Sequence, residues 1–226
     1  MKYPTLAILI PCYNEAECIE RAVLEASFYG HVIVIDNGSS DTSFTLAQQA
    51  GANVIKESRR GYGNAIMSGM LEAKRMHLDM AIVLDADLSD NPSDIPILVE
   101  PVLNEGIDLC LSSRTRLEDQ QNLEVHQRFG NRLAVRLIRW KTGFQYRDMG
   151  PFRAFRLNSL LELHLEDENF GWNIEMQMKA AQQKLRIREI ELPYRKRIAG
   201  TSKVSGNLHN SIRAGIIILR SVWKYS

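Results

Sequence analysis

The sequence predicts an α/β fold in which a mostly parallel central sheet is flanked by helices. The first observation is that short apolar runs alternate with longer amphipathic segments over the first half of the 226-residue chain. The second is that Pro, Asn or Gly punctuates the ends of several of these runs, as at the ends of strands. The third is a hydrophobic content of 45%, which is enough for one large core. We therefore expect a single domain.

Five apolar runs in the first half predict strands, and the segments between them predict helices. The expected strands cover residues 6–10, 32–36, 53–57, 80–87 and 108–114. Strands joined by helices form right-handed crossovers, so these strands should run parallel. Asn14 and Glu17 have the spacing of a capping box, which would begin the first helix. Ser40 or Asp41 would cap the second helix.

The pattern of alternation changes after residue 115. Helices are expected at 124–143, 173–185 and 208–225, and strands within 147–156 and at 186–194. The helix at 124–143 is amphipathic and cationic. The last helix contains an apolar run, residues 214–219, which is too short to span a membrane but could lie on an anionic membrane surface. The other interpretation is that this helix packs on the core or in a dimer interface.

Charge and cysteine content limit the function classes. The formal net charge is +1, so we expect no nucleic-acid partner. Residues 1–126 are acidic and residues 186–226 are basic, which predicts either one pocket for metal and phosphates or two separate solvated faces. Three cysteines without paired metal spacing favour a reducing, cytoplasmic compartment. The apolar N-terminal stretch is too short for a signal peptide or a membrane span.

Polar segments follow several expected strands and should meet at one edge of the sheet. They are residues 11–15, 36–38, 85–87 and Arg114. Ligands bind outside the carboxyl ends of parallel strands, so this edge is the expected site. Asp85 and Asp87 bring like charges together after a buried strand, which costs energy unless a cation or solvent offsets the repulsion. The two interpretations are a divalent-metal site and a solvated strand end.

Eight segments in order resemble family 2 glycosyltransferases, and the match is closest to the branch similar to dolichol-phosphate mannose synthase. They are IPCYNE, VIDNGSSDTS, RGYGNA, VLDADLSDNP, DLCLSSR, RFGNRLA, DMGPFRAF and GTSKVSG. The resemblance covers about residues 5–207. It implies a GT-A fold, a UDP- or GDP-linked sugar donor, Mg²⁺ or Mn²⁺, and inversion at the anomeric carbon. It also implies one domain, 1–226, with a nucleotide-binding half (1–115) and an acceptor half (116–226).

The resemblance assigns the metal to the aspartates of the D-A-D motif. Side chains alternate along a strand, so Asp85 and Asp87 would point to opposite sides if the strand continued through both. The family binds metal with the second aspartate, and Asp87 is therefore the expected direct ligand. Asp85 is expected to contact the ribose or the metal's outer ligands, and Ala86 lies between the two at the donor.

Further residues are assigned to the nucleotide. Pro11, Tyr13 and Glu15 match the family's loop around the base and ribose. Asp36 matches the carboxylate that accepts the imino N–H of the base, which suits uracil or guanine equally. Tyr13 could instead be a packing aromatic, and Asp36 a turn residue.

Gly63 and Asn64 open a helix, where free N–H groups could face an anionic ligand, although a plain tight turn is the alternative. Arg114, Arg128 and Arg132 are suited to phosphate oxygens, and Lys203 lies in a segment similar to the family's loop over donor and acceptor phosphates. The alternative for Arg128 and Arg132 is a solvated cationic face. Arg60 either lies near the nucleotide or is exposed.

The acceptor determines whether a catalytic base is needed. Asp148 is the first candidate to take a proton from a hydroxyl acceptor, and Glu175 is the second. A lipid phosphate acceptor is already ionised, and Asp148 would then position substrate instead. Glu175 could also be a surface carboxylate of its helix.

Other functions of the same architecture are less consistent with the sequence. A sugar nucleotidyltransferase would carry a glycine-rich loop with Arg and Lys after the first strand, where this chain has PCYNEAE. A sugar-nucleotide-binding module without activity is a second alternative. The expected partners are a nucleotide diphosphate sugar, a small-molecule or lipid-phosphate acceptor, a peripheral membrane surface and a second copy in a homo-oligomer.

Overall fold

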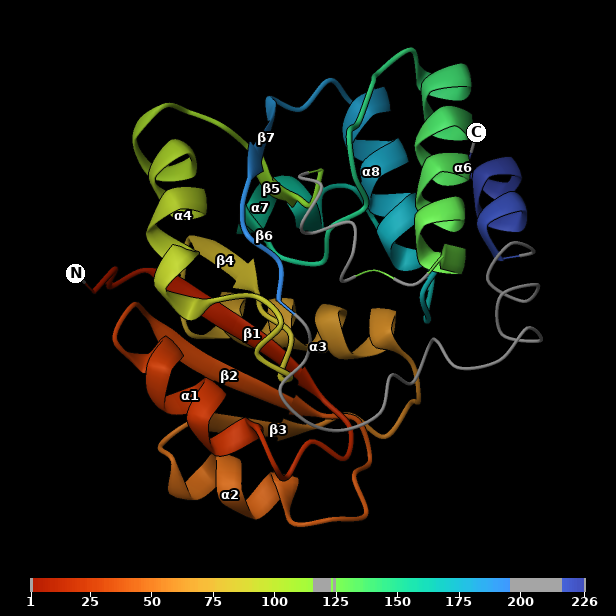
Figure 1. The fold of residues 1–226 in the computed structure, drawn as a ribbon. Helices are drawn as coiled ribbons and strands as arrows, with labels where there is room; N and C mark the ends of the chain where they lie inside the picture. Colours follow the sequence, from red (N-terminus) through yellow and green to blue (C-terminus); the bar gives the residue numbers. More distant parts are fainter. Residues whose placement is uncertain (1, 116–122, 124, 196–216, 226) are drawn as a thin grey trace.

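The computed structural model describes residues 2–115, 123, 125–195 and 217–225. Figure 1 shows the elements of these ranges, which follow the chain in this order: β1 (Leu6–Cys12), α1 (Ile19–Ser27), β2 (His31–Asp36), α2 (Ser43–Gln49), β3 (Asn53–Lys56), α3 (Tyr62–Arg75), β4 (Met80–Val83), the 3₁₀ turn η1 (Pro92–Asp94), α4 (Ile95–Asn104), β5 (Leu109–Ser113), α6 (Val125–Thr142), β6 (Arg153–Arg156), α7 (Leu157–Leu161), α8 (Trp172–Gln182) and β7 (Ile187–Glu191). Residues 217–224 form a further helix beside α6.

The strands form one seven-stranded sheet in the order β3-β2-β1-β4-β6-β5-β7. Every neighbouring pair is parallel except the two that involve β6, which runs antiparallel to β4 and to β5. The mostly parallel sheet predicted from the alternation of strands and helices is therefore confirmed. The strands of both halves of the chain join in this one sheet.

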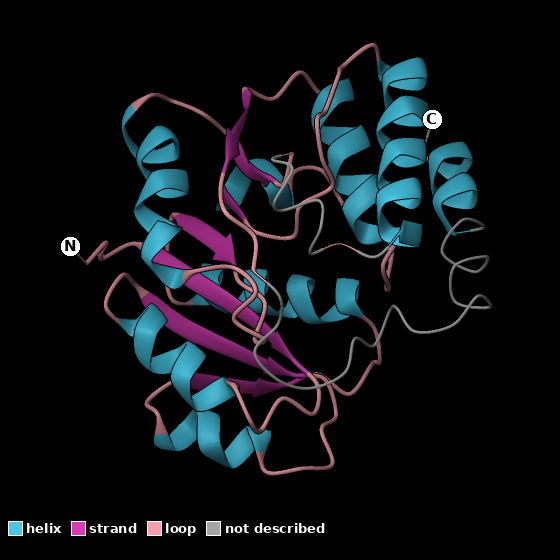
Figure 2. Ribbon diagram, viewed as in Figure 1, coloured by secondary structure: helices cyan, strands magenta, loops and turns pink. Residues whose placement is uncertain are grey.

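The sheet separates two hydrophobic cores, which Figure 2 shows as helical layers on its two faces. Along β1, Ala7 and Leu9 face one core, while Leu6, Ile8 and Ile10 face the other. This alternation is the period of two that a strand imposes on its side chains. Buried residues of α1 and α4 belong to one core and those of α3 and α8 to the other.

The capping box predicted at Asn14 is wrong. Helix α1 begins only at Ile19, and its N-cap residue Cys18 makes no side-chain capping bond. Asn14 instead has a positive φ of 53°, and its Oδ1 accepts a hydrogen bond from the backbone N–H of Ser40 at 2.8 Å. The side chain is used to join two loops that follow neighbouring strands, so it cannot begin a helix.

The C-terminal helix packs against the core through one side. Val222 and Tyr225 are buried, and Ile218 contacts the core that lies under α6. Within the described part of the expected apolar strip, Ile218 therefore packs on the core, whereas Leu219 is 43% exposed. Across the described ranges, every helix is either too short or too polar to be a candidate for crossing a bilayer.

Candidate active site

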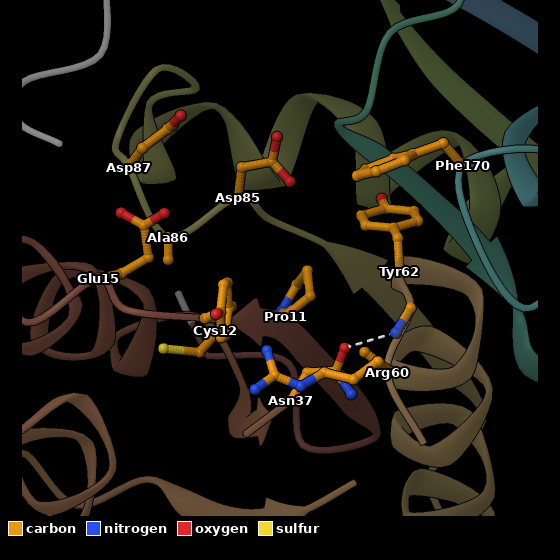
Figure 3. Close-up of a pocket in the computed structure, with 13 residues that line it drawn as sticks. Pro11, Cys12, Glu15, Asn37, Arg60, Tyr62, Asp85, Ala86, Asp87 and Phe170 are labelled. Carbon is orange, nitrogen blue, oxygen red and sulfur yellow. Dashed lines mark hydrogen bonds between the residues drawn. The ribbon is translucent and has the colours of Figure 1, made fainter. Parts of the chain in front are cut away.

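A cavity of about 350 Å³ opens at the carboxyl ends of β1, β2 and β4 (Figure 3). This is the edge at which the polar segments after the strands were expected to meet. The residues that line it are Pro11, Cys12, Tyr13, Glu15, Asn37, Arg60, Gly61, Tyr62, Ala65, Asp85, Ala86, Asp87 and Phe170. Six of the predicted site residues are therefore brought together here, namely Pro11, Tyr13, Glu15, Asp85, Ala86 and Asp87.

One side of the cavity carries three carboxylates, from Glu15, Asp85 and Asp87. Strand β4 ends at Val83, so the strand alternation expected at the two aspartates does not apply, and both line the cavity. Asp87 is 5% exposed, and its Oδ1 accepts the N–H of Ser89 at 2.9 Å. This bond fixes the direction of the Asp87 carboxylate.

Asp90, from the same motif, interacts electrostatically with Asp85 and Asp87 and was not among the predicted site residues. It is 3% exposed, and within the described residues its Oδ2 has no hydrogen-bond partner. Burial raises the pKa of Asp90 well above its usual range; the charges of Asp85 and Asp87 raise it further, while Arg114 opposes them. Its place three residues after Asp87, in the same polar segment, is the signal in the sequence by which it could be found.

The opposite side of the cavity is formed by a cation and an aromatic ring. The Arg60 guanidinium carbon lies 4.5 Å from the centroid of the Tyr13 ring, which is 37% exposed. Asn37, which the prediction missed, holds the arginine's segment in place, because its Oδ1 accepts the N–H of Gly61 at 2.8 Å. Asp36 does not line the cavity; its Oδ1 accepts the N–H of Ser39 at 3.1 Å.

An aromatic pair closes a third side. The rings of Tyr62 and Phe170 stack with their centroids 6.0 Å apart (Figure 3). Tyr62 begins helix α3, whereas Phe170 comes from the loop before α8. Neither was predicted, because only the folded chain brings segments more than 100 residues apart to one wall.

The start of α3 packs directly on the backbone of that loop. A Cβ on Gly63 would lie 1.9 Å from the carbonyl oxygen of Asp167, so only glycine fits without a shift. The N–H of Asn64 donates to the carbonyl oxygen of Glu168 at 3.1 Å. The expectation of a free N–H at Asn64 therefore fails, and neither Gly63 nor Asn64 lines the cavity.

Glu175 holds the same loop from the other side. It is fully buried, and its carboxylate accepts the N–H groups of Glu166 at 2.9 Å and Asp167 at 2.7 Å. It also pairs with Lys179 at 2.7 Å. Glu175 does not line the cavity, and these contacts favour a role in positioning the loop rather than the role of a base.

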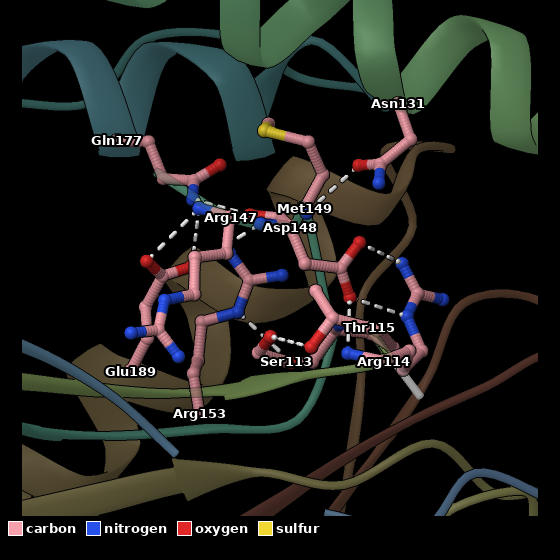
Figure 4. A network of polar contacts seen from close by, with 11 residues as sticks. Ser113, Arg114, Thr115, Asn131, Arg147, Asp148, Met149, Arg153, Gln177 and Glu189 are labelled. Carbon is pink, nitrogen blue, oxygen red and sulfur yellow. Dashed lines mark hydrogen bonds and ion pairs between the residues drawn. The ribbon is translucent and has the colours of Figure 1, made fainter. Parts of the chain in front are cut away.

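Asp148 and Arg114 form a buried ion pair (Figure 4). Oδ2 of Asp148 accepts Nε–H of Arg114 at 2.7 Å and its backbone N–H at 2.9 Å, and Oδ1 accepts Nη2–H at 3.2 Å. Burial alone would raise the pKa of Asp148, but the charge and hydrogen bonds of Arg114 hold that pKa below its usual value. Asp148 is therefore a poor proton acceptor.

The segment that carries Asp148 is fixed on both sides. The backbone N–H of Met149 donates to Oδ1 of Asn131 at 2.8 Å, and Nε2 of Gln177 donates to the Asp148 carbonyl oxygen at 3.2 Å. The neighbouring residues Arg128 and Arg132 lie on α6, half-buried and exposed respectively, and do not line the cavity. Lys203 lies outside the described residues.

The cavity suits a hard divalent cation chemically. Mg²⁺ is commonly held by one or two carboxylates together with substrate phosphates, and Asp85 and Asp87 offer that number. In the described part of the chain, no group of three His, Cys, Asp or Glu side chains has the arrangement of a protein-only metal site.

The chain was compared with known families and proteins. A family model described as "Glycosyl transferase family 2" matches residues 7–162. An uncharacterized glycosyltransferase of Mycobacterium tuberculosis is 34% identical over 224 residues, which is 97% of this chain and 96% of the relative. A UDP-N-acetylglucosamine–dolichyl-phosphate N-acetylglucosaminyltransferase of Methanococcus voltae is 25% identical over 82% of this chain and 83% of that protein.

Solved structures share the fold at low identity. Glucosyl-3-phosphoglycerate synthase of Mycobacterium tuberculosis, in complex with Mn²⁺, UDP and glucosyl-3-phosphoglycerate, superposes with a TM-score of 0.73 at 21% identity. The match covers 98% of this chain and 79% of that one. This similarity confirms the GT-A-like arrangement of sheet and helices. The family match over most of the chain and the relative that is 34% identical show that the chain is an enzyme of glycosyltransferase family 2.

Proposed function

We propose that the enzyme transfers a sugar from a nucleotide diphosphate sugar to a polyprenyl phosphate, with inversion at the anomeric carbon. The observation that carries the proposal is the cavity at the carboxyl edge of the sheet, where Asp85 and Asp87 face Tyr13 and Arg60. We further propose that residues 1–115 bind the nucleotide and residues 116–226 bind the acceptor.

The two sides of the cavity suit the two ends of the donor. Tyr13 offers a ring face for the base, with Pro11 and Glu15 beside it, and Arg60 provides a cation next to that ring. The carboxylates of Asp85 and Asp87 would hold Mg²⁺ or Mn²⁺ beside the diphosphate. Such a cation, when bound, stabilises the negative charge that develops on the leaving diphosphate.

The state of Asp148 favours a phosphate acceptor. A hydroxyl acceptor needs a base that takes its proton. Arg114 holds the pKa of Asp148 below its usual value, which makes this carboxylate a weak base, and Glu175 is engaged with backbone N–H groups. A phosphate monoester is already ionised near neutral pH and attacks without a base. The name of the archaeal relative includes dolichyl phosphate, which supports the same acceptor class.

Donor binding can be tested without turnover. The melting temperature of the protein should be measured with UDP-, GDP-, CDP- and dTDP-sugars, each with Mn²⁺, with Mg²⁺ and with excess EDTA. A ligand present at 100 times its dissociation constant adds about 2.7 kcal/mol to the free energy of unfolding. We expect one nucleotide class to stabilise the protein only with metal. Equal stabilisation in EDTA would contradict the metal assignment, and no stabilisation by any of them would contradict the donor class.

A further inference from the structure

Helix α6 presents a continuous outward stripe of arginines with an aromatic ring at each end. The exposed residues are Phe129, Arg132, Arg136, Arg139 and Trp140. Successive helical residues are 100° apart, so these five fall within an arc of about 100° and extend over about 16 Å. The sequence of α6 contains no Asp or Glu, so no acid on this helix neutralises the stripe.

The aromatic end of the stripe continues onto the C-terminal helix. Trp140 is 66% exposed and Trp223 is 62% exposed, and their rings meet edge to face at 6.0 Å. Nζ of Lys141 lies 4.7 Å from the centroid of Trp140 and 4.0 Å from that of Trp223. Large aromatic rings this open to water, grouped with cations, are typical of a surface that contacts another phase or partner.

The arginines of the stripe do not take part in packing α6 against the core. Ala134 and Ile138 are buried on the other side of the helix and provide the packing against the core. Arg136 and Arg139 are therefore not needed to hold α6 in place. On the C-terminal helix, Leu219 and Arg220 are also exposed, whereas Lys224 lies 4.0 Å from Glu166 and is partly neutralised.

We infer that this stripe, with Trp223, Leu219 and Arg220, is a docking surface for an anionic lipid bilayer. Tryptophan rings settle at the level of lipid headgroups, and arginines beside them are attracted to anionic lipids. A second copy of the chain fits less well, because a two-fold contact would place the same arginines against one another. The inference extends the proposed lipid-phosphate acceptor, since it would place the enzyme at the surface that holds such a substrate.

Binding is measured with the full chain and no donor, so its outcome is independent of transfer. Vesicles of phosphatidylcholine alone are compared with vesicles containing equal parts of phosphatidylcholine and phosphatidylglycerol, at low and high salt. We expect co-sedimentation only with the anionic vesicles, falling as salt screens the charges. Arg136→Gln with Arg139→Gln should weaken binding about 25-fold, since each cation near such a surface contributes roughly fivefold.

Tryptophan fluorescence tests whether Trp140 and Trp223 contact the bilayer. The chain has three, and Trp172 is fully buried, so brominated anionic lipid should quench Trp140 and Trp223 selectively. In Trp140→Phe with Trp223→Phe, the remaining fluorescence should not respond to the brominated lipid. Quenching that persists in this double variant would place another part of the chain at the bilayer and overturn the inference.

A charge-matched control removes two cations elsewhere. Lys2 is exposed before β1 and Lys74 is exposed on α3, so Lys2→Gln with Lys74→Gln should bind as the wild type does. Equal weakening in the control would show a non-specific charge effect and contradict the inference. It would also be overturned by failure to co-sediment at low salt, or by binding to single-stranded DNA that exceeds binding to anionic vesicles.

Discussion

At Asp148, burial and charge act in opposite directions on one carboxyl group. Burial alone would favour the neutral acid, but three hydrogen bonds from Arg114 favour the anion and prevail. Removing one partner of a buried ion pair leaves the other charge uncompensated, which costs roughly 3–5 kcal/mol. The pair therefore fixes the segment between α6 and β6 in addition to any contact with substrate.

We predict that Asp148→Asn lowers the free energy of unfolding at pH 7 by about that amount, measured by urea titration. A carboxyl group whose pKa is depressed on folding stabilises the protein above its unfolded pKa of about 3.9 and loses that contribution as pH falls. The difference between wild type and variant should therefore shrink below about pH 4. A difference that stays constant down to pH 3 would show that the ion pair is not its source.

A substitution at Asp87 tests the proposed metal ligand of the donor site. Asp87→Asn keeps the size of the side chain and its capacity to accept the N–H of Ser89, but removes the charge. We predict that the variant folds, loses sugar transfer, and loses metal-dependent stabilisation by the nucleotide. Asp79→Asn, which changes an exposed aspartate before β4, is the matched control and should behave as wild type. A variant at position 87 with full activity would remove the metal assignment.

The sequence predicted residues whose position follows from a strand end, but not those placed by distant segments. Asp85, Asp87 and Tyr13 were found because motif and strand order put them on one edge of the sheet. Tyr62 and Phe170 were missed because they meet only in the folded chain. The burial of Glu175, which contradicts the alternative of a surface carboxylate, was missed for the same reason, since its partners Glu166 and Asp167 lie in a loop without a helical or strand pattern.

At the scale of elements, the loop before α8 and the start of α3 behave as one unit. Glu175 binds two N–H groups of the loop, and the loop's carbonyl oxygens rest on Gly61 and Gly63. Phe170, which lines the cavity, is carried by this loop. A change that releases the loop should therefore alter the donor cavity without touching the donor.

We predict that Glu175→Gln destabilises the fold by roughly 1–3 kcal/mol and raises the KM for the donor more than it lowers kcat. Gly63→Ala should have the same effect on KM, because its methyl group would displace Asp167. The two changes act on one loop, so their effects should not add. Steady-state kinetics of both variants and of the pair test this.

Matched controls separate the loop from general destabilisation. Glu162→Gln changes an exposed carboxylate after α7, and Gly130→Ala adds a methyl group with an ordinary contact of 3.5 Å to Ile218. Both should keep the wild-type KM. If Glu175→Gln instead removed transfer, at unchanged donor KM and stability, then Glu175 would be acting as a base.

The period of the apolar residues predicted which segments are helices and which are strands. It did not predict where each strand ends or in which direction it runs. The buried runs at β1 and β2 are confirmed as strands, but the expected fourth strand ends at Val83 because residues 84–87 turn into the cavity wall. The antiparallel direction of β6 could not be predicted, because four residues with an arginine at each end carry no signal for it.

Over the whole molecule, the acidic and the basic side chains lie in different places. The acidic half supplies Asp85, Asp87 and Glu15 to the cavity, as one interpretation expected. In the described part of the basic second half, the exposed arginines of α6 point outward. They belong to the surface inferred to meet lipid.

The proposed reaction is transfer to a phosphate rather than to a hydroxyl. To test this, the wild-type enzyme is incubated with a labelled nucleotide diphosphate sugar, Mn²⁺, and either a polyprenyl phosphate or the matching polyprenol. The transfer of label into the lipid is then measured. We expect lipid-linked sugar from the phosphate alone, and none with Asp87→Asn or with EDTA. Transfer to the polyprenol but not to the phosphate would contradict the proposed reaction, because a hydroxyl acceptor requires the base that Asp148, paired with Arg114, does not provide.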